Sequence, residues 1–252
     1  MNWYSDERVR SVRMLTRLMT ARGSRSALHL CNLVASVHFS GLPTITLTEM
    51  RARLGRGTPG AAPGNVVLHG ELHGFGAGSI GEMAGLSSLV AAHQPRNLLE
   101  FGTCQGCSTW HLWANSPKDA RITTVDLPSG LTVEGSTDPE LQGDKVRRFL
   151  PEDPRVRLVE TDSRSFDPSG LGSVDFCFID AGHSYACVKN DTEKALSVLV
   201  RGGLLVWHDA TWTDDDYGVN RYLKELRGQG LDIRQVTLGP FDYCALAVLI
   251  RA

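Results

Sequence analysis

Short apolar runs alternate with amphipathic stretches along the chain from Asn97 onward. Five of these runs end in an acidic residue, a leucine or a glycine: Asn97–Gly102, Arg121–Leu127, Val156–Asp162, Val174–Asp180 and Leu204–Asp209. Compact apolar runs of this kind are typical of strands that are covered on both faces of a parallel sheet. Their alternation with helical patterns and short connections indicates βαβ units.

Amphipathic periodicity predicts the helices between these strands: Ser108–Asn115, Pro139–Leu150, Tyr185–Val200 and Val219–Arg227. The pair Gly202-Gly203 is expected to stop the third of them. Two further strands, Asp232–Leu238 and Cys244–Ile250, are expected to pair as an antiparallel hairpin. The predicted fold class is therefore α/β, with a doubly wound, mostly parallel, seven-stranded sheet that ends in an antiparallel hairpin.

The first part of the chain has a different pattern. Asp6–Met19 and Leu28–Val37 are predicted to be amphipathic helices, and ten of the 26 glycines lie between Gly55 and Gly85. We therefore expect residues 1–64 to form an N-terminal helical extension with a Gly/Pro-rich linker, and residues 65–252 to form the main domain. The glycine-rich segment is expected to be a linker or a lid. The N-terminal helices are expected to form a homo-oligomer interface or to cover the site.

Composition narrows the classes of function. The chain is 42% hydrophobic and 21% charged, with a net charge of −2 spread along its length, so nucleic acid is not an expected partner. The longest apolar stretch near the N-terminus, Leu28–Phe39, is too short to span a membrane and lies too far into the chain for a signal peptide, which favours a cytoplasmic protein. The six cysteines are scattered, which predicts reduced, buried thiols. Cys104 and Cys107 form one CxxC pair, a weak indication of redox or zinc chemistry.

Three polar positions at strand ends suggest a nucleoside site. The run Leu98–Thr109 leads from a strand through a Gly-x-x-x-Gly turn into a helix, where a ligand could approach the backbone, although a purely structural turn fits as well. Asp126 ends the second strand, where an acid accepts hydrogen bonds from ribose hydroxyls. Cys104 replaces the second glycine of the dinucleotide fingerprint, which favours a nucleoside without phosphates. Thr161–Ser163 could reach an adenine edge or serve as a turn or helix cap.

These motifs resemble those of class I S-adenosylmethionine-dependent O-methyltransferases, which have a Rossmann-like fold. Val174–Tyr185 is similar to the DxxFIDgdHSY stretch of bacterial small-molecule methyltransferases, and Gly202–Asp209 is similar to the GGxxxxHD that follows it. The resemblance covers about Gly78 to Ala252. It implies that S-adenosyl-L-methionine is bound by Glu100, Gly102, Thr103, Gly106, Ser108, Asp126, Leu127, Asp162, Ser163 and Asp180.

The resemblance also implies a divalent metal. Catechol O-methyltransferase and the macrolide sugar O-methyltransferases hold one with an acid that ends the fourth strand and with two polar residues 28 and 29 positions later, which here are Asp180, His208 and Asp209. A histidine in this set suits a transition metal better than Mg²⁺. His183, three residues after Asp180, matches the base of the sugar enzymes, so Asp180 and His183 are the expected catalytic residues. Alternatively, His208 only ends a strand and His183 only binds substrate.

The expected function is O-methylation of a small hydroxylated metabolite, a sugar or a phenol of secondary metabolism. Two alternatives remain open. Cephalosporin hydroxylase-like proteins resemble the same region, and iron held by Asp180, His208 and Asp209 would suit such an oxygenase. The chain could also be a non-catalytic protein that keeps the cofactor pocket, since a fold does not fix a function. The methyltransferase and the oxygenase are distinguished by whether product formation depends on S-adenosylmethionine.

Overall fold

The computed structural model describes residues 41–54, 65–69, 78–128, 131, 147–212, 217–238 and 244–252. Its strands are β1 (Thr44–Thr46), β2 (Asn97–Phe101), β3 (Arg121–Asp126), β4 (Val156–Glu160), β5 (Val174–Ile179), β6 (Leu199–Trp207), β7 (Arg234–Thr237) and β8 (Ala247–Ile250). Its helices are α3 (Leu47–Leu54), α4 (Ile80–His93), α5 (Cys107–Asn115), the short η3 (Pro168–Leu171), α6 (Tyr185–Val198) and α7 (Val219–Gly228).

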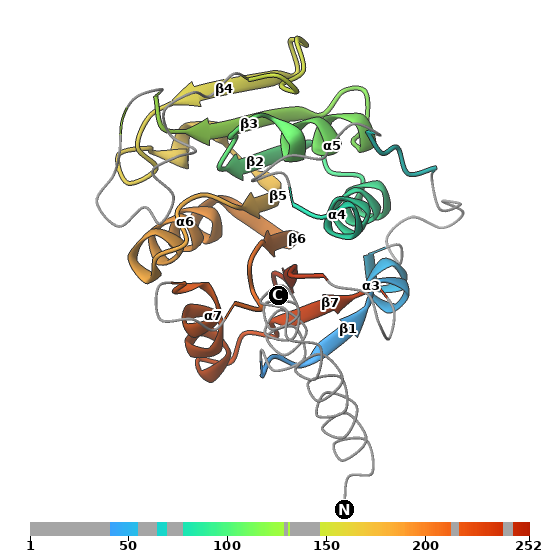
Figure 1. The fold of residues 1–252 in the computed structure, drawn as a ribbon, viewed down its shortest axis with the longest axis vertical. Helices are drawn as coiled ribbons and strands as arrows, with labels where there is room; N and C mark the ends of the chain where they lie inside the picture. The colour runs from blue at the N-terminus through green and yellow to red at the C-terminus, as the bar shows by residue number, and fades with distance from the viewer. Residues whose placement is uncertain are drawn as a thin grey trace, which may run out of the picture.

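All described strands lie in one sheet, in the order β1-β7-β8-β6-β5-β2-β3-β4 (Figure 1). Among these strands, β8 alone runs antiparallel to its neighbours β6 and β7. The expected α/β class, the mostly parallel sheet and the C-terminal antiparallel pair are therefore confirmed. The residues that join the two strands of this pair, 239–243, lie outside the described residues.

The sheet has eight strands, one more than the seven that the sequence predicts. The additional strand, β1, comes from inside the expected N-terminal extension and pairs in parallel with β7. Only its central residue, Ile45, is buried, so a short edge strand of this kind leaves little periodic signal. The expected helices Asp6–Met19 and Leu28–Val37 lie outside the described residues, and no helix in the described part is long and apolar enough to cross a membrane.

Helices cover both faces of the sheet, and each face has its own apolar core (Figure 1). On one face, Met83, Leu86 and Leu89 of α4 and Leu112 of α5 pack with Phe178 and neighbouring strand residues. The other face is covered by α6 and α7, with their buried residues Val188, Ala195, Tyr222, Leu223 and Leu226. Burial on both faces explains why the central strands β2, β5 and β6 are rich in apolar residues.

Helices α5, α6 and α7 confirm three of the four predicted helices to within two residues at each end. The fourth prediction, Pro139–Leu150, is wrong at its described end, because residues 147–150 form a turn; residues 139–146 lie outside the described part. Gly202 and Gly203 do not stop α6. That helix ends at Val198, and the two glycines lie within β6, where Gly202 has a φ of 77°.

The glycine-rich segment expected over 55–85 is described only in part. Its residues 80–85 are helical and begin α4, so this portion is neither a linker nor a lid. Ser79 caps α4 by accepting the backbone N–H of Glu82, while the Glu82 carboxylate accepts the N–H of Ser79. This reciprocal capping box fixes the first turn of a helix. Residues 55–64 and 70–77 lie outside the described residues.

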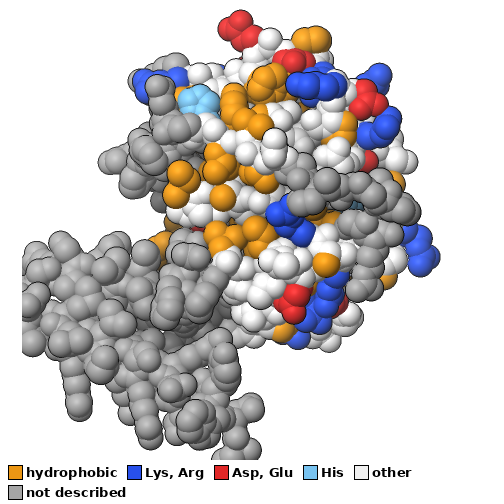
Figure 2. Space-filling view, turned by 90° about the vertical axis from the view of Figure 1, so that its right-hand side faces the viewer, with side chains coloured by type: hydrophobic (Ala, Val, Ile, Leu, Met, Phe, Trp, Pro, Cys, Tyr) orange, Lys and Arg blue, Asp and Glu red, His pale blue; other side chains and the backbone are white. Residues whose placement is uncertain are grey.

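Figure 2 shows the face of the molecule that lies on the right-hand side of Figure 1. Positive and negative side chains are interspersed there, and hydrophobic side chains gather between them. In the described part of the chain, the exposed large hydrophobic residues are Val67, Leu68, Ile80 and Leu131. The surface charge visible from this side is therefore mixed, in keeping with the dispersed charge of the sequence.

Candidate functional site

The carboxyl ends of β2, β5 and β6 meet at one edge of the sheet. The pairing of Phe101 with Ile179 and of Ile179 with Trp207 places Gly102, Asp180 and His208 side by side just beyond these strands. Backbone hydrogen bonds continue this alignment, since the Asp180 N–H donates to the Phe101 carbonyl at 2.8 Å and the His208 N–H donates to the Ile179 carbonyl at 3.0 Å. The strand order reverses between β2 and β5, which is where open α/β sheets bind ligands.

The predicted glycine turn, from Gly102 to Gly106, directly follows β2 at this edge of the sheet. Gly102 has a φ of 97°, and a Cβ atom there would lie 2.0 Å from the Asp180 carbonyl oxygen. Gly106 has a φ of 88°, and its Cβ would lie 2.5 Å from the Leu150 nitrogen. Glycine is therefore required at both positions by backbone conformation and by close approach. The turn is structural in this sense, and it also brings any ligand bound on it beside Asp180.

A buried carboxyl group lies under the glycine turn. Glu100 is fully buried, and its Oε2 accepts a hydrogen bond from the Thr109 hydroxyl at 2.5 Å. Its Oε1 has no hydrogen-bond partner among the described residues. Burial raises the pKa of Glu100 to about 7, against the opposing hydrogen bonds of Ser108, Thr109 and Thr124. The buried Thr103 hydroxyl pairs with that of Thr124 at 2.6 Å. The predicted residues Glu100, Thr103 and Ser108 are thus all buried beside the glycine turn.

Asp126 is held beside the same turn. Its Oδ2 accepts the Cys104 N–H at 2.8 Å and a guanidinium N–H of Arg147 at 2.6 Å, while its Oδ1 accepts the Leu127 N–H at 2.9 Å. Arg147 also donates to the Cys104 carbonyl at 2.6 Å. The arginine therefore ties the end of β3 to the glycine turn. The sequence gives no signal for this role, because Arg147 lies in the segment that was expected to be helical.

Asp162 and Ser163 lie in the turn that follows β4. The Asp162 carboxylate accepts the backbone N–H and the guanidinium of Arg164, and its backbone carbonyl accepts the N–H of Ser165. The Ser163 carbonyl accepts a hydrogen bond from Lys194 of α6. The turn role that the sequence left open is therefore present. Contact of these residues with an adenine ring stays a prediction.

The CxxC pair has no redox or zinc geometry. Cys104 and Cys107 do not form a disulfide, and neither do the other cysteines in the described part of the chain, Cys177, Cys187 and Cys244. Burial raises the pKa of Cys107 to about 11, so its thiolate is scarce at neutral pH. These five cysteines are reduced, as the sequence predicts, while Cys31 lies outside the described residues.

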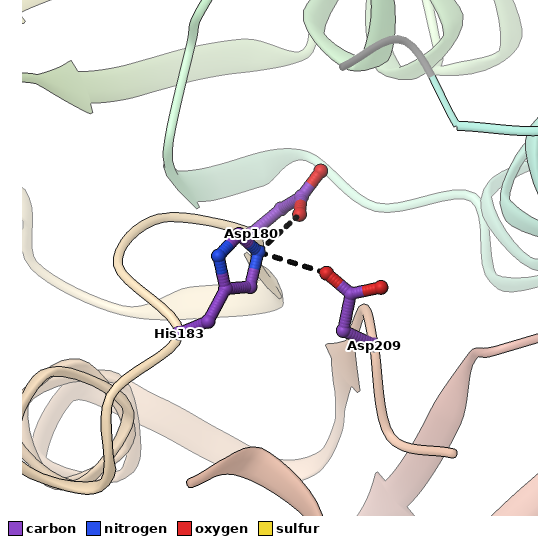
Figure 3. A group of neighbouring side chains, drawn as sticks. All are labelled: Asp180, His183 and Asp209. Atoms are coloured by element: carbon purple, nitrogen blue, oxygen red, sulfur yellow. Dashed lines mark ion pairs between the residues drawn. The ribbon is translucent and has the colours of Figure 1, made fainter. Parts of the chain in front are cut away.

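Two histidines and two aspartates, His183, His208, Asp180 and Asp209, form an acid–histidine cluster at the ends of β5 and β6. Figure 3 shows three of them, Asp180, His183 and Asp209. Nε2 of His183 lies 2.8 Å from Oδ2 of Asp209 and 3.9 Å from Oδ1 of Asp180. Nδ1 of His208 lies 3.2 Å from each of these two oxygens. Neither ring nitrogen of His208 forms a hydrogen bond of good geometry with a described residue. All four residues that the sequence singles out at these strand ends are therefore in one cluster.

Each group in this cluster shifts the pKa of its neighbours. Burial opposes a charge on His183, but the hydrogen bonds and charges of Asp180 and Asp209 outweigh it and raise the His183 pKa to about 9. The same two carboxylates raise the pKa of the buried His208 well above its ordinary value. In return, the histidines hold the pKa values of Asp180 and Asp209 below normal despite burial. Without another cation, both histidines are therefore protonated at neutral pH.

The donor atoms of this cluster fit a metal ion. Ligand atoms of Asp180, His183 and Asp209 all lie within 4.8 Å of one another. This set has His183 where the sequence predicts His208, but Nδ1 of His208 faces the same two carboxylate oxygens. Two carboxylates with one or two imidazoles form a suitable site for a borderline divalent ion. The predicted set of Asp180, His208 and Asp209 stays a prediction beside this one.

Three residues that the sequence did not single out as site residues border the cluster. Oε1 of the buried Glu82, on α4, lies 3.4 Å from Nε2 of His208. The Tyr217 ring lies 5.0 Å from that of His183, and the Trp212 ring stacks on Tyr217 at 5.5 Å. The aromatic pair forms a wall beside His183. Glu82 and Tyr217 carry no motif that would identify them.

The chain is similar to known methyltransferases. Residues 99–210 match the model of a methyltransferase domain family. A Klebsiella pneumoniae protein described as an O-methyltransferase superposes with a TM-score of 0.52 and 19% identity, over 82% of this chain and 90% of that protein. The O-methyltransferase TomG from Streptomyces achromogenes, involved in tomaymycin synthesis and solved with SAM, gives 0.51 and 16%, over 86% and 96%.

A third similar structure, the O-methyltransferase NovP, has a TM-score of 0.53 and 14% identity, over 69% of this chain and 80% of NovP. No curated protein matches the sequence. At these identities the solved structures establish the fold, and the matched family covers the segment from β2 to the end of the acid–histidine cluster.

Proposed function

We propose, from the premise that this chain contains a class I methyltransferase domain, that it transfers the methyl group of S-adenosylmethionine to a hydroxyl group of a small molecule. The acceptor is proposed to be a hydroxylated metabolite such as a sugar or a phenol. A divalent cation at the acid–histidine cluster is proposed to assist the transfer.

One observation carries this proposal: the contact between Gly102 and Asp180. The glycine turn, on which we place the cofactor, and the acid–histidine cluster are in backbone contact. Methyl transfer from a sulfonium is an in-line displacement, so donor and acceptor must lie at adjacent sites. A cofactor on the turn and a hydroxyl at the cluster would satisfy this requirement.

The residues around the turn are suited to the cofactor. The unpartnered Oε1 of the buried Glu100 offers an acceptor under the turn. Asp126, already oriented by Cys104 and Arg147, offers its carboxylate at the end of β3, where ribose hydroxyls are bound in related folds. Leu127 and the Asp162–Ser163 turn follow on the adenine side of this arrangement. We propose that all of these residues line the cofactor site.

A divalent cation would be held by Asp180, His208 and Asp209, so that His183 can serve as the base. When bound, such an ion would polarise the acceptor hydroxyl and lower its pKa. The aromatic wall of Trp212 and Tyr217 beside His183 would present a flat apolar face to the acceptor. Such a face suits a phenol ring or the apolar face of a sugar.

His183 is the proposed acceptor of the hydroxyl proton. As the C–S bond breaks and its electron pair returns to sulfur, the hydroxyl oxygen forms the new C–O bond and its proton passes to Nε2 of His183. A histidine with a pKa of about 9 is already protonated at neutral pH and cannot do this. His183 can therefore act as the base only when another cation balances the charge of Asp180 and Asp209.

The test is methyl transfer from labelled S-adenosylmethionine to a panel of phenols and sugars, before and after chelation. We expect turnover to vanish with the chelator and to return with Mn²⁺, Co²⁺ or Mg²⁺. Asp180→Asn and Asp209→Asn should lose the bound metal, whereas His183→Ala should keep it and lose turnover. A chelated, metal-free enzyme with full activity would contradict the metal role.

Cofactor binding is tested separately by calorimetry with S-adenosylhomocysteine. Asp126→Ala should weaken binding by roughly ten- to a hundredfold, since a charge-assisted hydrogen bond is worth roughly 1.5–3 kcal/mol. Unchanged affinity would remove Asp126 from the site. Tight binding together with failure of every acceptor and metal would instead favour a non-catalytic binding protein.

A second candidate function, metal-dependent oxidation, is favoured by the presence of two histidines in the cluster. His183, His208 and one aspartate have the composition of the two-histidine, one-carboxylate set found in non-haem iron oxygenases. In that case, product formation would require ferrous ion and dioxygen and would continue without S-adenosylmethionine. Dependence on the methyl donor alone decides between the two functions.

A further inference from the structure

Glu82 lies outside the strand ends that form the cluster, yet its side chain reaches one member of it. It is in the first turn of α4, and its side chain is only 3% exposed. Its Oε2 accepts the Ser79 N–H at 2.7 Å, and its Oε1 accepts the Ala245 N–H at 3.1 Å. The same Oε1 lies 3.4 Å from Nε2 of His208. Glu82 therefore connects the start of α4, the segment before β8 and the cluster.

The ring of His208 lies between the carboxylate of Glu82 on one side and those of Asp180 and Asp209 on the other. Its Nε2 faces Glu82, and its Nδ1 faces the oxygens of Asp180 and Asp209 at 3.2 Å each. Gly78 lies beside this nitrogen, since a Cβ on Gly78 would be 3.5 Å from Nε2. The two nitrogens of an imidazole point in different directions, so a partner at one of them fixes where the other points.

A capping box alone does not explain the position of Glu82. The Oε2 atom completes the capping box with Ser79, and a capping glutamate can do this at the surface. A carboxylate is costly to bury unless it is paired. Here the second oxygen is directed inward, to the Ala245 N–H and to His208. The capping box therefore does not account for Oε1, the oxygen that is directed to Ala245 and His208.

We propose that Glu82 is a positioning residue that holds the ring of His208 so that Nδ1 points into the gap between Asp180 and Asp209. Histidines that bind metals are commonly oriented by a carboxylate on their other nitrogen, and loss of that outer partner typically costs 10–100-fold in metal affinity. This inference rests on the proposed metal at the cluster. It also commits His208, rather than His183 alone, to the ligand set.

The first experiment measures Co²⁺ affinity of the full chain by its visible absorption, for the wild type and for Glu82→Gln. Glutamine keeps the size of the side chain and one acceptor oxygen. We expect affinity to fall about 10–100-fold and the cobalt spectrum to change. In the His208→Ala background, Glu82→Gln should have no further effect, because its action passes through that ring. Affinity for S-adenosylhomocysteine should stay the same in every variant.

Ser79→Ala is the matched control. It removes the hydroxyl that accepts the Glu82 N–H and weakens the same capping box without touching His208. It should lower stability while leaving Co²⁺ affinity and spectrum unchanged. If Glu82→Gln binds Co²⁺ like the wild type, or if Ser79→Ala weakens binding equally, Glu82 is a cap and the proposal is overturned.

A second readout uses the metal-free protein and does not depend on the proposed function. In ¹⁵N-histidine-labelled wild type, the Nε2 proton of His208 should exchange slowly because it is buried and faces the Glu82 carboxylate at 3.4 Å. Ser79→Ala should keep this signal and Glu82→Gln should lose it. Its absence in the wild type would overturn the positioning role. Its presence in a wild type that binds no Co²⁺ would support the positioning role and refute the metal site instead.

Discussion

The contact between Gly102 and Asp180 can be tested by placing one methyl group at Gly102. Gly102→Ala adds a Cβ that would lie 2.0 Å from the Asp180 carbonyl oxygen and 2.5 Å from its carbonyl carbon, at a φ of 97°. Gly230 has nearly the same φ, 100°, but nothing in the described structure lies within 4 Å of its Cβ position. The two substitutions therefore share the free-energy cost of a positive φ, and only Gly102→Ala adds a steric clash with Asp180.

The expected magnitudes follow from this difference. A non-glycine residue in a left-handed conformation costs roughly 1–2 kcal/mol. The smaller entropy of the unfolded alanine chain offsets roughly 0.4–1 kcal/mol of this. Gly230→Ala should therefore destabilise the protein by about 1 kcal/mol. Overpacking adds roughly 1–3 kcal/mol at Gly102, and the colliding atoms belong to backbone, which cannot rotate away. Gly102→Ala should thus be about 1–3 kcal/mol less stable than Gly230→Ala.

The assay is urea unfolding monitored by fluorescence. The free energies of unfolding of the two variants can be compared directly if their m values are the same. Binding of S-adenosylhomocysteine should also weaken in Gly102→Ala, because the turn must shift away from Asp180, and it should be unchanged in Gly230→Ala. If the two variants prove equally stable, Gly102 and Asp180 do not approach each other as described. The cofactor site and the cluster would then not be adjacent.

Two further predictions concern charged groups. His183 has its pKa raised from 6.5 to about 9, so its pairing stabilises the metal-free fold fully below pH 6.5 and is lost as pH rises through 9. The stability gap between wild type and His183→Asn in urea should shrink from roughly 3 kcal/mol at pH 6 toward zero above pH 9; a constant gap would contradict this. Arg147→Ala should cost roughly 1.5–3 kcal/mol in the same assay, because its pair with Asp126 is largely buried. Arg96→Ala, which breaks an equally short but exposed pair, should cost less than about 1 kcal/mol, and equal losses would refute the role of burial.

The central sheet could be predicted from the sequence because burial leaves a direct pattern there. Strands β2 and β5 are largely buried and mostly apolar, β3 mixes apolar with polar residues, and all three begin and end within one or two residues of the predicted ranges. Helix α6 was equally clear from its spacing of apolar residues. Its end was misplaced because Gly202 and Gly203 were taken for a stop signal, although they lie four residues into β6.

The four residues of the cluster could be predicted because they lie just after the ends of β5 and β6. The spacing from Asp180 to His208 holds one helix and one strand, so the chain returns to the neighbouring position at the same edge. Glu82 could not be found this way. Its hydrogen bond to Ala245 joins residues 163 positions apart, and its contact with His208 depends on how α4 packs against the sheet. Arg147 escaped detection for the same reason, since its partners lie on the glycine turn and β3.

The backbone at Asp209 explains how consecutive residues serve one site. Successive side chains on a strand point to opposite faces, so His208 and Asp209 could not both face Asp180 if β6 continued. The strand ends at Trp207, and Asp209 has a φ of 52°, which brings its Oδ2 to 3.2 Å from Nδ1 of His208. Aspartate tolerates this left-handed conformation better than most residues, but it still stores strain, and such strain is typically found at functional sites. The turn at Asp209 is therefore the local feature that converts two adjacent residues into partners at the cluster.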